Sequence, residues 1–169
     1  PASAGAAAEA VGTRKHRDAA RNLAEDAVTL LRNSGGVLPL EQGATVSVTG
    51  SGAERIGAGL EELGYTVVSD PAAADAAVVG TLNARGDAEQ RSLVSAAQGA
   101  GTPVVAVAQG NPYDIAELGG VDGYLATYSS VDASRAAAAR VLAGEVSPSG
   151  RLPVGIPGTD LEFGDGMSY

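Results

Sequence analysis

The stretch TVSVTGSGAERIGAGLEELGYTVV, residues 45–68, decides the fold class of this chain. It begins with a β-rich run at 45–49, continues after a glycine-rich turn with apolar residues three and four positions apart, and ends in a second β-rich run at 65–68. Spacings of three and four are typical of one face of a helix, and short β-branched runs are typical of strands. The order strand, helix, strand predicts a βαβ unit with parallel strands.

The same alternation continues along the chain and predicts an α/β domain. Val104–Ala108 is a continuous apolar run, as expected of a strand buried on both faces. Asp87, with Gln90 three residues later, matches a capping box at a helix start. We predict strands at 45–49, 65–68, 76–79, 104–108 and 124–126, and helices at 53–63, from 87 to about 99, and from a cap at Ser130 or Asp132 to 143. Together they predict a doubly wound, mostly parallel sheet of five or six strands with helices on both faces, a flavodoxin-like α/β sandwich.

The N-terminal region divides into two parts. Residues 1–12 are rich in Ala and Gly without a clear period, which predicts a flexible lead-in or linker. Between Thr13 and Asn33 apolar residues recur at spacings of three and four, which predicts one helix that ends at Ser34-Gly35-Gly36. Residues 13–169 then form a single domain, large enough to bury about 70% of the surface of its unfolded chain.

Composition and charge exclude several classes of function. The formal net charge of −9 argues against nucleic-acid binding, which needs a basic surface. Aromatic residues make up 4% of the chain and Trp is absent, which argues against a stand-alone carbohydrate-binding module. No run of 18 apolar residues could span a membrane, and no Cys is present. Because the chain begins at Pro1 and has one Met, we expect it to be a piece of a longer protein.

No set of residues suggests a catalytic or cofactor site. The single histidine, His16, lies in the first predicted helix, far in sequence from any strand end, and no Gly-x-Ser-x-Gly elbow or cluster of metal ligands is present. Gly50-Ser51-Gly52, with Asp70 some 20 residues later, imitates a dinucleotide-binding fingerprint. Arg55, however, occupies the third glycine position, where a bulky side chain would prevent close helix–strand packing. We therefore predict no metal, no cofactor and no binding of NAD or FAD.

Ligands of doubly wound sheets bind at the loops that follow the carboxyl ends of the strands. These loops are expected at 50–52, 80–86, 109–114 and 127–132. In the third, Gly110 permits close backbone approach, Pro112 stiffens the loop, and Asn111, Tyr113 and Asp114 offer hydrogen-bonding groups. Two interpretations stay open for this loop: a tight turn with Asp114 near a helix start, or the edge of a binding site.

Seven motifs stand in a fixed order along the chain. They are Ala24–Asn33, Leu38-Pro39-Leu40, Val79-Gly80-Thr81, Asn111-Pro112-Tyr113-Asp114, Ala126-Thr127-Tyr128-Ser129-Ser130, Pro148-Ser149-Gly150-Arg151-Leu152-Pro153-Val154 and Phe163-Gly164-Asp165-Gly166-Met167-Ser168-Tyr169. In this order they resemble the C-terminal domain of family 3 glycoside hydrolases. The Asn-Pro-Tyr-Asp and Ala-Thr-Tyr-Ser pieces are most similar to its β-N-acetylhexosaminidase (β-N-acetylglucosaminidase) branch.

The resemblance implies a two-domain parent enzyme. Family members pair an N-terminal (β/α)8 barrel, which carries an aspartate nucleophile, with this α/β sandwich, and they are retaining glycosidases. In the β-glucosidase branch the acid/base is a glutamate on the loop after the third strand of the sandwich. Here that loop, residues 81–89, has no early glutamate, and Asp87 and Glu89 fall at the predicted helix start. In the hexosaminidase branch the acid/base is a histidine of the barrel, so that branch is favoured and no catalytic residue is expected in this chain.

The resemblance also sets our expectations for partners and contacts. The expected partners are the barrel of the same parent and a glycan held mainly by that barrel, with the isolated chain inactive. We expect substrate-side or interdomain contacts from Asn83, Arg85, Asn111, Tyr113, Asp114, Tyr128 and Ser129. We expect the parent to be extracellular or on the cell surface. Two alternatives stay open: a non-catalytic interaction or stability domain of a degenerate parent, and a nucleotide-binding α/β domain.

Overall fold

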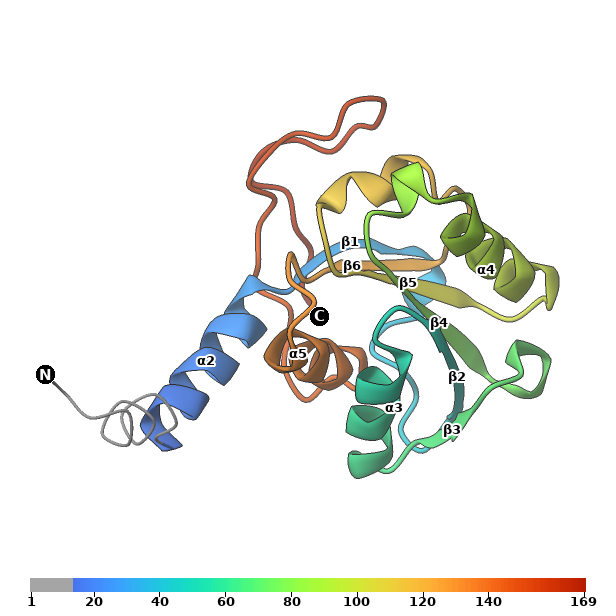
Figure 1. The fold of residues 1–169 in the computed structure, drawn as a ribbon, viewed down its shortest axis with the longest axis horizontal. Coiled ribbons are helices and arrows are strands. Elements are labelled where there is room, and N and C mark those ends of the chain that lie inside the picture. Colours follow the sequence, from blue (N-terminus) through green and yellow to red (C-terminus); the bar gives the residue numbers. More distant parts are fainter. Residues whose placement is uncertain (1–13) are drawn as a thin grey trace, which may run out of the picture.

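A six-stranded sheet forms the centre of the computed structural model, which describes residues 14–169 (Figure 1). The predicted lead-in at 1–12 lies outside the described residues. The strand order is β1-β6-β5-β4-β2-β3, in which β2 to β6 are parallel and β1 is antiparallel to β6. The strands are β1 Thr29–Asn33, β2 Thr45–Gly50, β3 Thr66–Val68, β4 Ala76–Thr81, β5 Val104–Ala108 and β6 Gly123–Ala126. The helices are α2 Arg14–Ala27, α3 Ala53–Glu62, α4 Ala88–Gly99 and α5 Asp132–Leu142, with short 3₁₀ helices η1 Ser34–Gly36, η2 Pro71–Ala73, η3 Ala84–Gly86 and η4 Pro112–Ala116.

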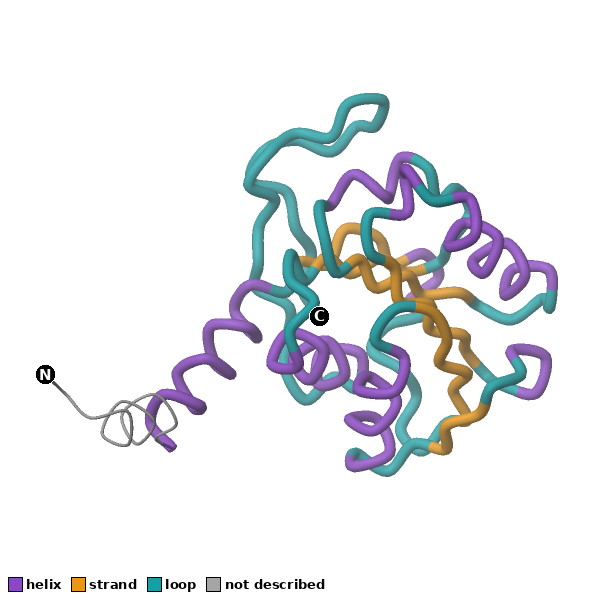
Figure 2. The backbone as a smooth tube through the Cα atoms, viewed as in Figure 1, coloured by secondary structure: helices purple, strands orange, loops and turns teal. Residues whose placement is uncertain are grey.

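Both faces of the sheet are covered, which confirms the predicted α/β sandwich (Figures 1 and 2). Successive residues of a strand point to opposite faces, so the continuous apolar run of β5 serves two cores. Val105 and Val107 join the core beneath α3 and α5, whereas Val104, Ala106 and Ala108 join the core beneath α4 and η4. The buried run therefore explains why both faces need a covering layer.

The first helix is shorter than predicted. It ends at Ala27, and Thr29–Asn33 forms the edge strand β1 instead of the last turns of a helix. Leu30 packs in the core of one face of the sheet and Leu31 in the core of the other, which is the alternation of a strand. Antiparallel pairing with β6 thus overrides the three- and four-residue spacing, and it supplies the sixth strand.

The C-terminal segment contacts β1 and the residue that precedes it. Gly150 donates from its backbone N to the carbonyl of Val28, and Met167 donates from its backbone N to the carbonyl of Leu30 over 2.8 Å. Leu152 and Ile156 fill the core that α4 and η4 also cover. This segment therefore completes the cover of that face of the sheet. Among the described residues no helix has the length and hydropathy to cross a bilayer.

Candidate functional site

The loops after β4 and β5 form one hydrogen-bonded unit, which we call the amide knuckle and define as Asn83–Gly86 with Gly110–Asp114. Asn83 has the left-handed φ of 56°. Its Oδ1 accepts from the backbone N of Asn111 at 3.2 Å and from Asn111 Nδ2 at 2.6 Å. A Cβ on Gly110 would overlap this amide, so the glycine is required for the close approach of the loops. The knuckle brings together five of the seven predicted residues: Asn83, Arg85, Asn111, Tyr113 and Asp114.

The buried side chain of Asp114 links the two loops of the amide knuckle. Its side chain is fully buried, and it accepts from Thr81 Oγ1 at 3.1 Å and from the backbone N of Arg85 at 3.0 Å. Asn111 caps η4 by accepting from the backbone N of Tyr113 at 3.1 Å. Asp114 lies in the first turn of η4, which confirms the predicted tight turn with Asp114 near a helix start. Asp114 is also a buried link between loops, which fixes the position of Arg85.

The carboxylate of Asp87 caps α4. Asp87 Oδ1 accepts from the backbone N of Glu89 at 3.0 Å and of Gln90 at 3.1 Å, and Oδ2 accepts from Gln90 Nε2 at 2.9 Å. This confirms the predicted cap at Asp87. The bond from the Gln90 side chain, followed by the backbone bonds, lowers the pKa of Asp87 from its ordinary value. Asp87 is thus an ionised N-cap with its lone pairs engaged.

The two remaining predicted residues lie on the loop after β6, and their interactions point away from the amide knuckle. Tyr128 has a φ of 56° and donates from its hydroxyl to Thr29 Oγ1 over 3.0 Å. Burial raises the pKa of this phenol. Ser129 Oγ accepts from the backbone N of Val131 at 3.4 Å. Val131 is the N-cap residue of α5, so the predicted cap at Ser130 or Asp132 is wrong.

A polar pair that the sequence did not single out lies beside the turn that follows β2. Gln109 is 1% exposed and donates from Nε2 to the carbonyl of Ser51 at 2.5 Å. Arg135 Nε donates to Gln109 Oε1 over 2.7 Å, and Arg135 also lies 3.6 Å from Asp132. One feature of the sequence could have pointed to this pair: Gln109 is a polar residue directly after the apolar run of β5. No local pattern pointed to its partner on α5.

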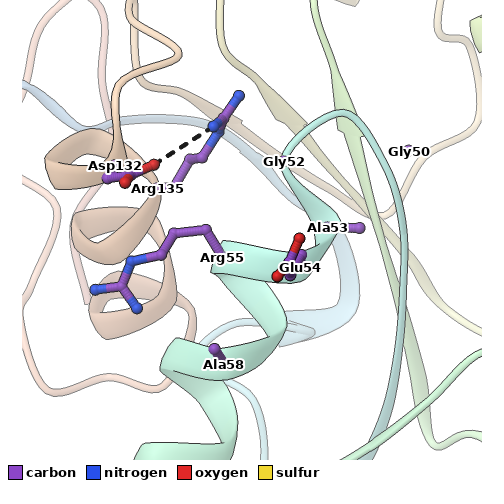
Figure 3. Close-up of a pocket in the computed structure, with 8 residues that line it drawn as sticks. All are labelled: Gly50, Gly52, Ala53, Glu54, Arg55, Ala58, Asp132 and Arg135. Carbon is purple, nitrogen blue, oxygen red and sulfur yellow. Dashed lines mark ion pairs between the residues drawn. The ribbon is translucent and has the colours of Figure 1, made fainter.

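The Gly50-Ser51-Gly52 turn borders a cavity of about 500 Å³ between the starts of α3 and α5 (Figure 3). Both glycines have positive φ, so the turn itself requires them. Arg55 extends toward α5 and not toward the sheet, so our reason for rejecting a nucleotide, that Arg55 separates helix and strand, is wrong. The strand order reverses between β2 and β4, where such ligands bind, and there the buried Gln109 side chain already donates to the Ser51 carbonyl of the turn. The expectation that NAD and FAD do not bind stays a prediction, now with this different reason. In residues 14–169 no three His, Cys, Asp or Glu side chains gather as metal ligands would.

Comparisons with known proteins agree with this fold. The solved structures that resemble the chain include a fungal multi-domain family 3 β-N-acetylglucosaminidase (TM-score 0.79, 24% identity, 95% of this chain and 21% of that one). They also include a family 3 β-N-acetylglucosaminidase from Paenibacillus sp. (TM-score 0.75, 24% identity, 88% of this chain and 34% of that one). A β-glucosidase from Erythrobacter marinus gives a TM-score of 0.76 at 20% identity, over 98% of this chain and 36% of that one. These likenesses establish the fold.

The chain spans between 21% and 36% of the length of these three structures. No curated protein sequence matches it. The family model described as the glycosyl hydrolase family 3 C-terminal domain matches residues 66–167, which is more than half of the chain. The chain therefore belongs to the family of glycosyl hydrolase family 3 C-terminal domains.

Proposed function

We propose that this chain is the C-terminal domain of a family 3 β-N-acetylhexosaminidase and that it packs on the catalytic barrel of its parent. In this arrangement the carboxyl edge of the sheet faces the barrel and forms one wall of the sugar site. The parent hydrolyses terminal β-N-acetylglucosaminides with retention of configuration. The chain alone contributes no nucleophile and no acid/base, and it is inactive.

The observation that carries the proposal is the use of carboxylates on the amide knuckle. Retaining chemistry needs a nucleophile and a proton donor about 5–5.5 Å apart, or an equivalent donor. Asp114 is buried and accepts two hydrogen bonds within the protein, and Asp87 caps α4. Glu117, a further carboxylate near the knuckle, lies 3.6 Å from Arg85 Nε. Residues 82–87 between β4 and α4 include no glutamate, and Glu89 lies in the first turn of α4. The absence of an early glutamate supports the branch whose proton donor belongs to the barrel.

The rigidity of the amide knuckle supports the proposed wall function. The two bonds from Asn111 to Asn83 and the buried link at Asp114 fix the loops before any substrate arrives. Preorganised polar groups keep a bound sugar in a reactive position without the entropy cost of ordering a loop at each turnover. Arg85, whose side chain is 60% exposed, and Asn83 supply N–H donors suited to sugar hydroxyl and acetamido oxygens.

The test compares two chromogenic substrates on the full-length parent. We expect hydrolysis of the β-N-acetylglucosaminide, and a β-glucoside turned over at least about a hundredfold more slowly, because the site is built around the acetamido group. The isolated chain should hydrolyse neither. Asp87→Asn and Glu89→Gln should leave parental kcat unchanged, since neither side chain takes part in proton transfer. Preference for the glucoside, or activity of the isolated chain that Asp87→Asn abolishes, would refute the proposal.

A further inference from the structure

The cavity between the starts of α3 and α5 is lined by charged side chains that the proposed function does not use (Figure 3). Its volume of about 500 Å³ lies within the range of small-molecule sites. Glu54 and Arg55 line it from α3, and Asp132 and Arg135 line it from α5. Two helices thus offer both hydrogen-bond donors and acceptors to one space.

The basic side chains of this cavity are more buried than the acidic ones. The side chain of Arg135 is 23% exposed and that of Arg55 is 37% exposed, whereas that of Asp132 is 80% exposed. Glu54 is also an exposed residue. Because water screens exposed charges more strongly than buried ones, the interior of the cavity favours an anion and its rim is acidic.

Arg135 lies directly against the glycine that begins α3. A Cβ on Gly52, the N-cap residue of α3, would lie 2.9 Å from Arg135 Cδ and closer still to Arg135 Nε, so the guanidinium needs a glycine there. Arg135 Nε donates to Gln109 Oε1 over 2.7 Å, and Nη1 lies 3.6 Å from Asp132 Oδ1, beyond ordinary hydrogen-bond length. A guanidinium has five N–H donors, so its Nη groups are able to donate to a ligand.

The start of α3 adds backbone donors beside this guanidinium. No side chain caps the helix at Gly52, and Ile56 N donates to the carbonyl of Gly52 over 3.0 Å as the first bond within the helix. The N–H groups of residues 53–55 therefore have no acceptor within α3. Charged donors and free N–H groups at one place are the arrangement that binds phosphate groups in proteins.

Arg55 extends to a different end of the cavity. Figure 3 shows its guanidinium pointing toward α5 and away from Gly52, whereas Arg135 lies beside the turn. Arg55 pairs with Glu62 over 3.9 Å, and the Glu62 side chain is 73% exposed. Since the two guanidinium groups point to different ends, a ligand that contacts both is longer than a phosphate ion.

We infer that this cavity binds a phosphorylated monosaccharide, and we call Glu54, Arg55, Asp132 and Arg135 with the start of α3 the α3–α5 site. The phosphate accepts from Arg135 and from the N–H groups at the start of α3. The sugar hydroxyls donate to Glu54 and Asp132 and accept from Arg55. This binding site goes beyond the proposed function and does not depend on it.

The lining favours this ligand over three others. Its eight residues include no aromatic side chain on which a nucleobase could stack. A neutral sugar would leave the partly buried guanidinium of Arg135 without an anion. Inorganic phosphate would leave Arg55 and the acidic rim without a contact. A phosphorylated sugar uses both ends of the cavity and its rim.

Calorimetry and NMR on the 169-residue chain test the inference, with glucose 6-phosphate, inorganic phosphate and glucose as probes. We expect glucose 6-phosphate to bind with a Kd of about 1 mM or lower. It should bind at least about tenfold more tightly than inorganic phosphate, because its hydroxyls add hydrogen bonds. Glucose should show no saturable binding. Amide shifts should change chiefly at residues 52–56 and 131–135.

Two variants and a matched control locate the ligand. Arg135→Gln should weaken the binding of glucose 6-phosphate and of inorganic phosphate by about tenfold or more, because it removes the charged donor. Arg55→Gln should weaken glucose 6-phosphate about threefold or more and leave inorganic phosphate unchanged. Arg140→Gln is the control, since Arg140 is also on α5, is 38% exposed and does not line the cavity. It should leave both affinities unchanged.

Each other outcome overturns the inference. Absence of saturable binding of glucose 6-phosphate at about 10 mM contradicts it directly. Equal affinity for inorganic phosphate identifies a plain anion site, and equal affinity for glucose identifies a neutral-sugar site. Equal losses in Arg55→Gln and Arg140→Gln identify attraction by overall charge. Thermal unfolding shows whether Arg135→Gln is folded; if it is not, the different responses of the two phosphate probes to Arg55→Gln decide the question.

Discussion

The amide knuckle and the turn after β2 both lie at the carboxyl edge of the sheet, but different interactions hold them. Side chains hold the knuckle: Asn111 donates to Asn83, and Asp114 accepts from Thr81 at the end of β4 and from Arg85 in the loop that follows it. Backbone atoms hold the turn: Ser51 N donates to the carbonyl of Gly80 over 2.8 Å, with no room for a Cβ between them. The exposed amides of the knuckle can therefore be replaced by other side chains, whereas the turn after β2 has no room for a Cβ at Gly50 or Gly80.

If the proposed function is correct, we expect this difference to separate residues needed for function from residues needed for folding along one edge of the sheet. Changes to the exposed amides of the knuckle, Asn83 and Asn111, should alter the position of surface groups at modest cost in stability. Changes in the turn should destabilise the sheet itself, since β2 and β4 are neighbours there. The predictions below test this separation.

The largest effect is expected for Gly80→Ala. The added Cβ would overlap the Ser51 carbonyl oxygen and lie 2.9 Å from Gln109 Nε2, and backbone cannot yield as a flexible side chain does. We expect a loss of about 3 kcal/mol in the free energy of unfolding. Thermal unfolding should record this as a decrease in Tm of roughly 6–12 °C.

Gly99→Ala is the control for this substitution. Gly99 ends α4 without a positive φ, and a Cβ added there would meet no neighbouring atom within 4 Å. Gly99→Ala should therefore change the free energy of unfolding by about 0.5 kcal/mol or less. Equal Tm values for the two variants would show that the turn can relax, and the contrast with the knuckle would fail.

Asp114→Ala should have the second-largest effect. The substitution leaves Thr81 Oγ1 and the backbone N of Arg85 without an acceptor in a buried place, which costs about 2 kcal/mol. Denaturant unfolding measures the loss, with Asp160→Ala as the control because Asp160 is exposed. A loss no greater than that of the control would mean that water replaces the carboxylate.

The spacing of apolar residues along the sequence was enough to predict most of the fold. The strand–helix alternation located β2 to β6 because each strand is short, apolar and bounded by turn residues. It failed at Thr29–Asn33, where the leucines fit a helical stripe and a strand equally well. Only the pairing of this segment with β6, nearly a hundred residues away, decides between the two.

The candidate site was predictable in its place and only partly in its interactions. Parallel strands bring their carboxyl ends together, so the loops holding Asn83 and Asn111 could be predicted to be neighbours. The bond between Gln109 and Arg135 joins a strand end to a distant helix, and no local pattern encodes such a contact. Likewise, the burial of Asp114 depends on how η4 packs, which composition does not reveal.

A smaller effect is expected at Asp87, between the knuckle and α4. Its pKa is lowered chiefly by the Gln90 side chain, so the ionised form is favoured in the folded state. This contribution to stability is present above the ordinary pKa of 3.8 and is lost as the pH falls through the lower folded-state value. Gln90→Ala should move the NMR titration midpoint of Asp87 up toward 3.8, while Gln98→Ala should not. An unchanged midpoint in Gln90→Ala would contradict the cause assigned here.

The smallest effect on stability, and the sharpest test of the comparison, is expected for Asn111→Ala. Asn111 is only half-buried, and its bonds join surface loops, so the isolated chain should lose about 0.5 kcal/mol. In the parent the same change releases Asn83 from its fixed position and should decrease kcat/KM about tenfold or more, because misplaced positioning groups raise the barrier to reaction. Gln98→Ala is the matched control: it removes a bond of 2.9 Å from an amide side chain to the carbonyl of Gly119, at the opposite edge of the sheet. The control should match Asn111→Ala in stability and leave kcat/KM unchanged. If both variants have wild-type kinetics, the amide knuckle is a structural turn, and the division of this edge into a folding part and a functional part is wrong.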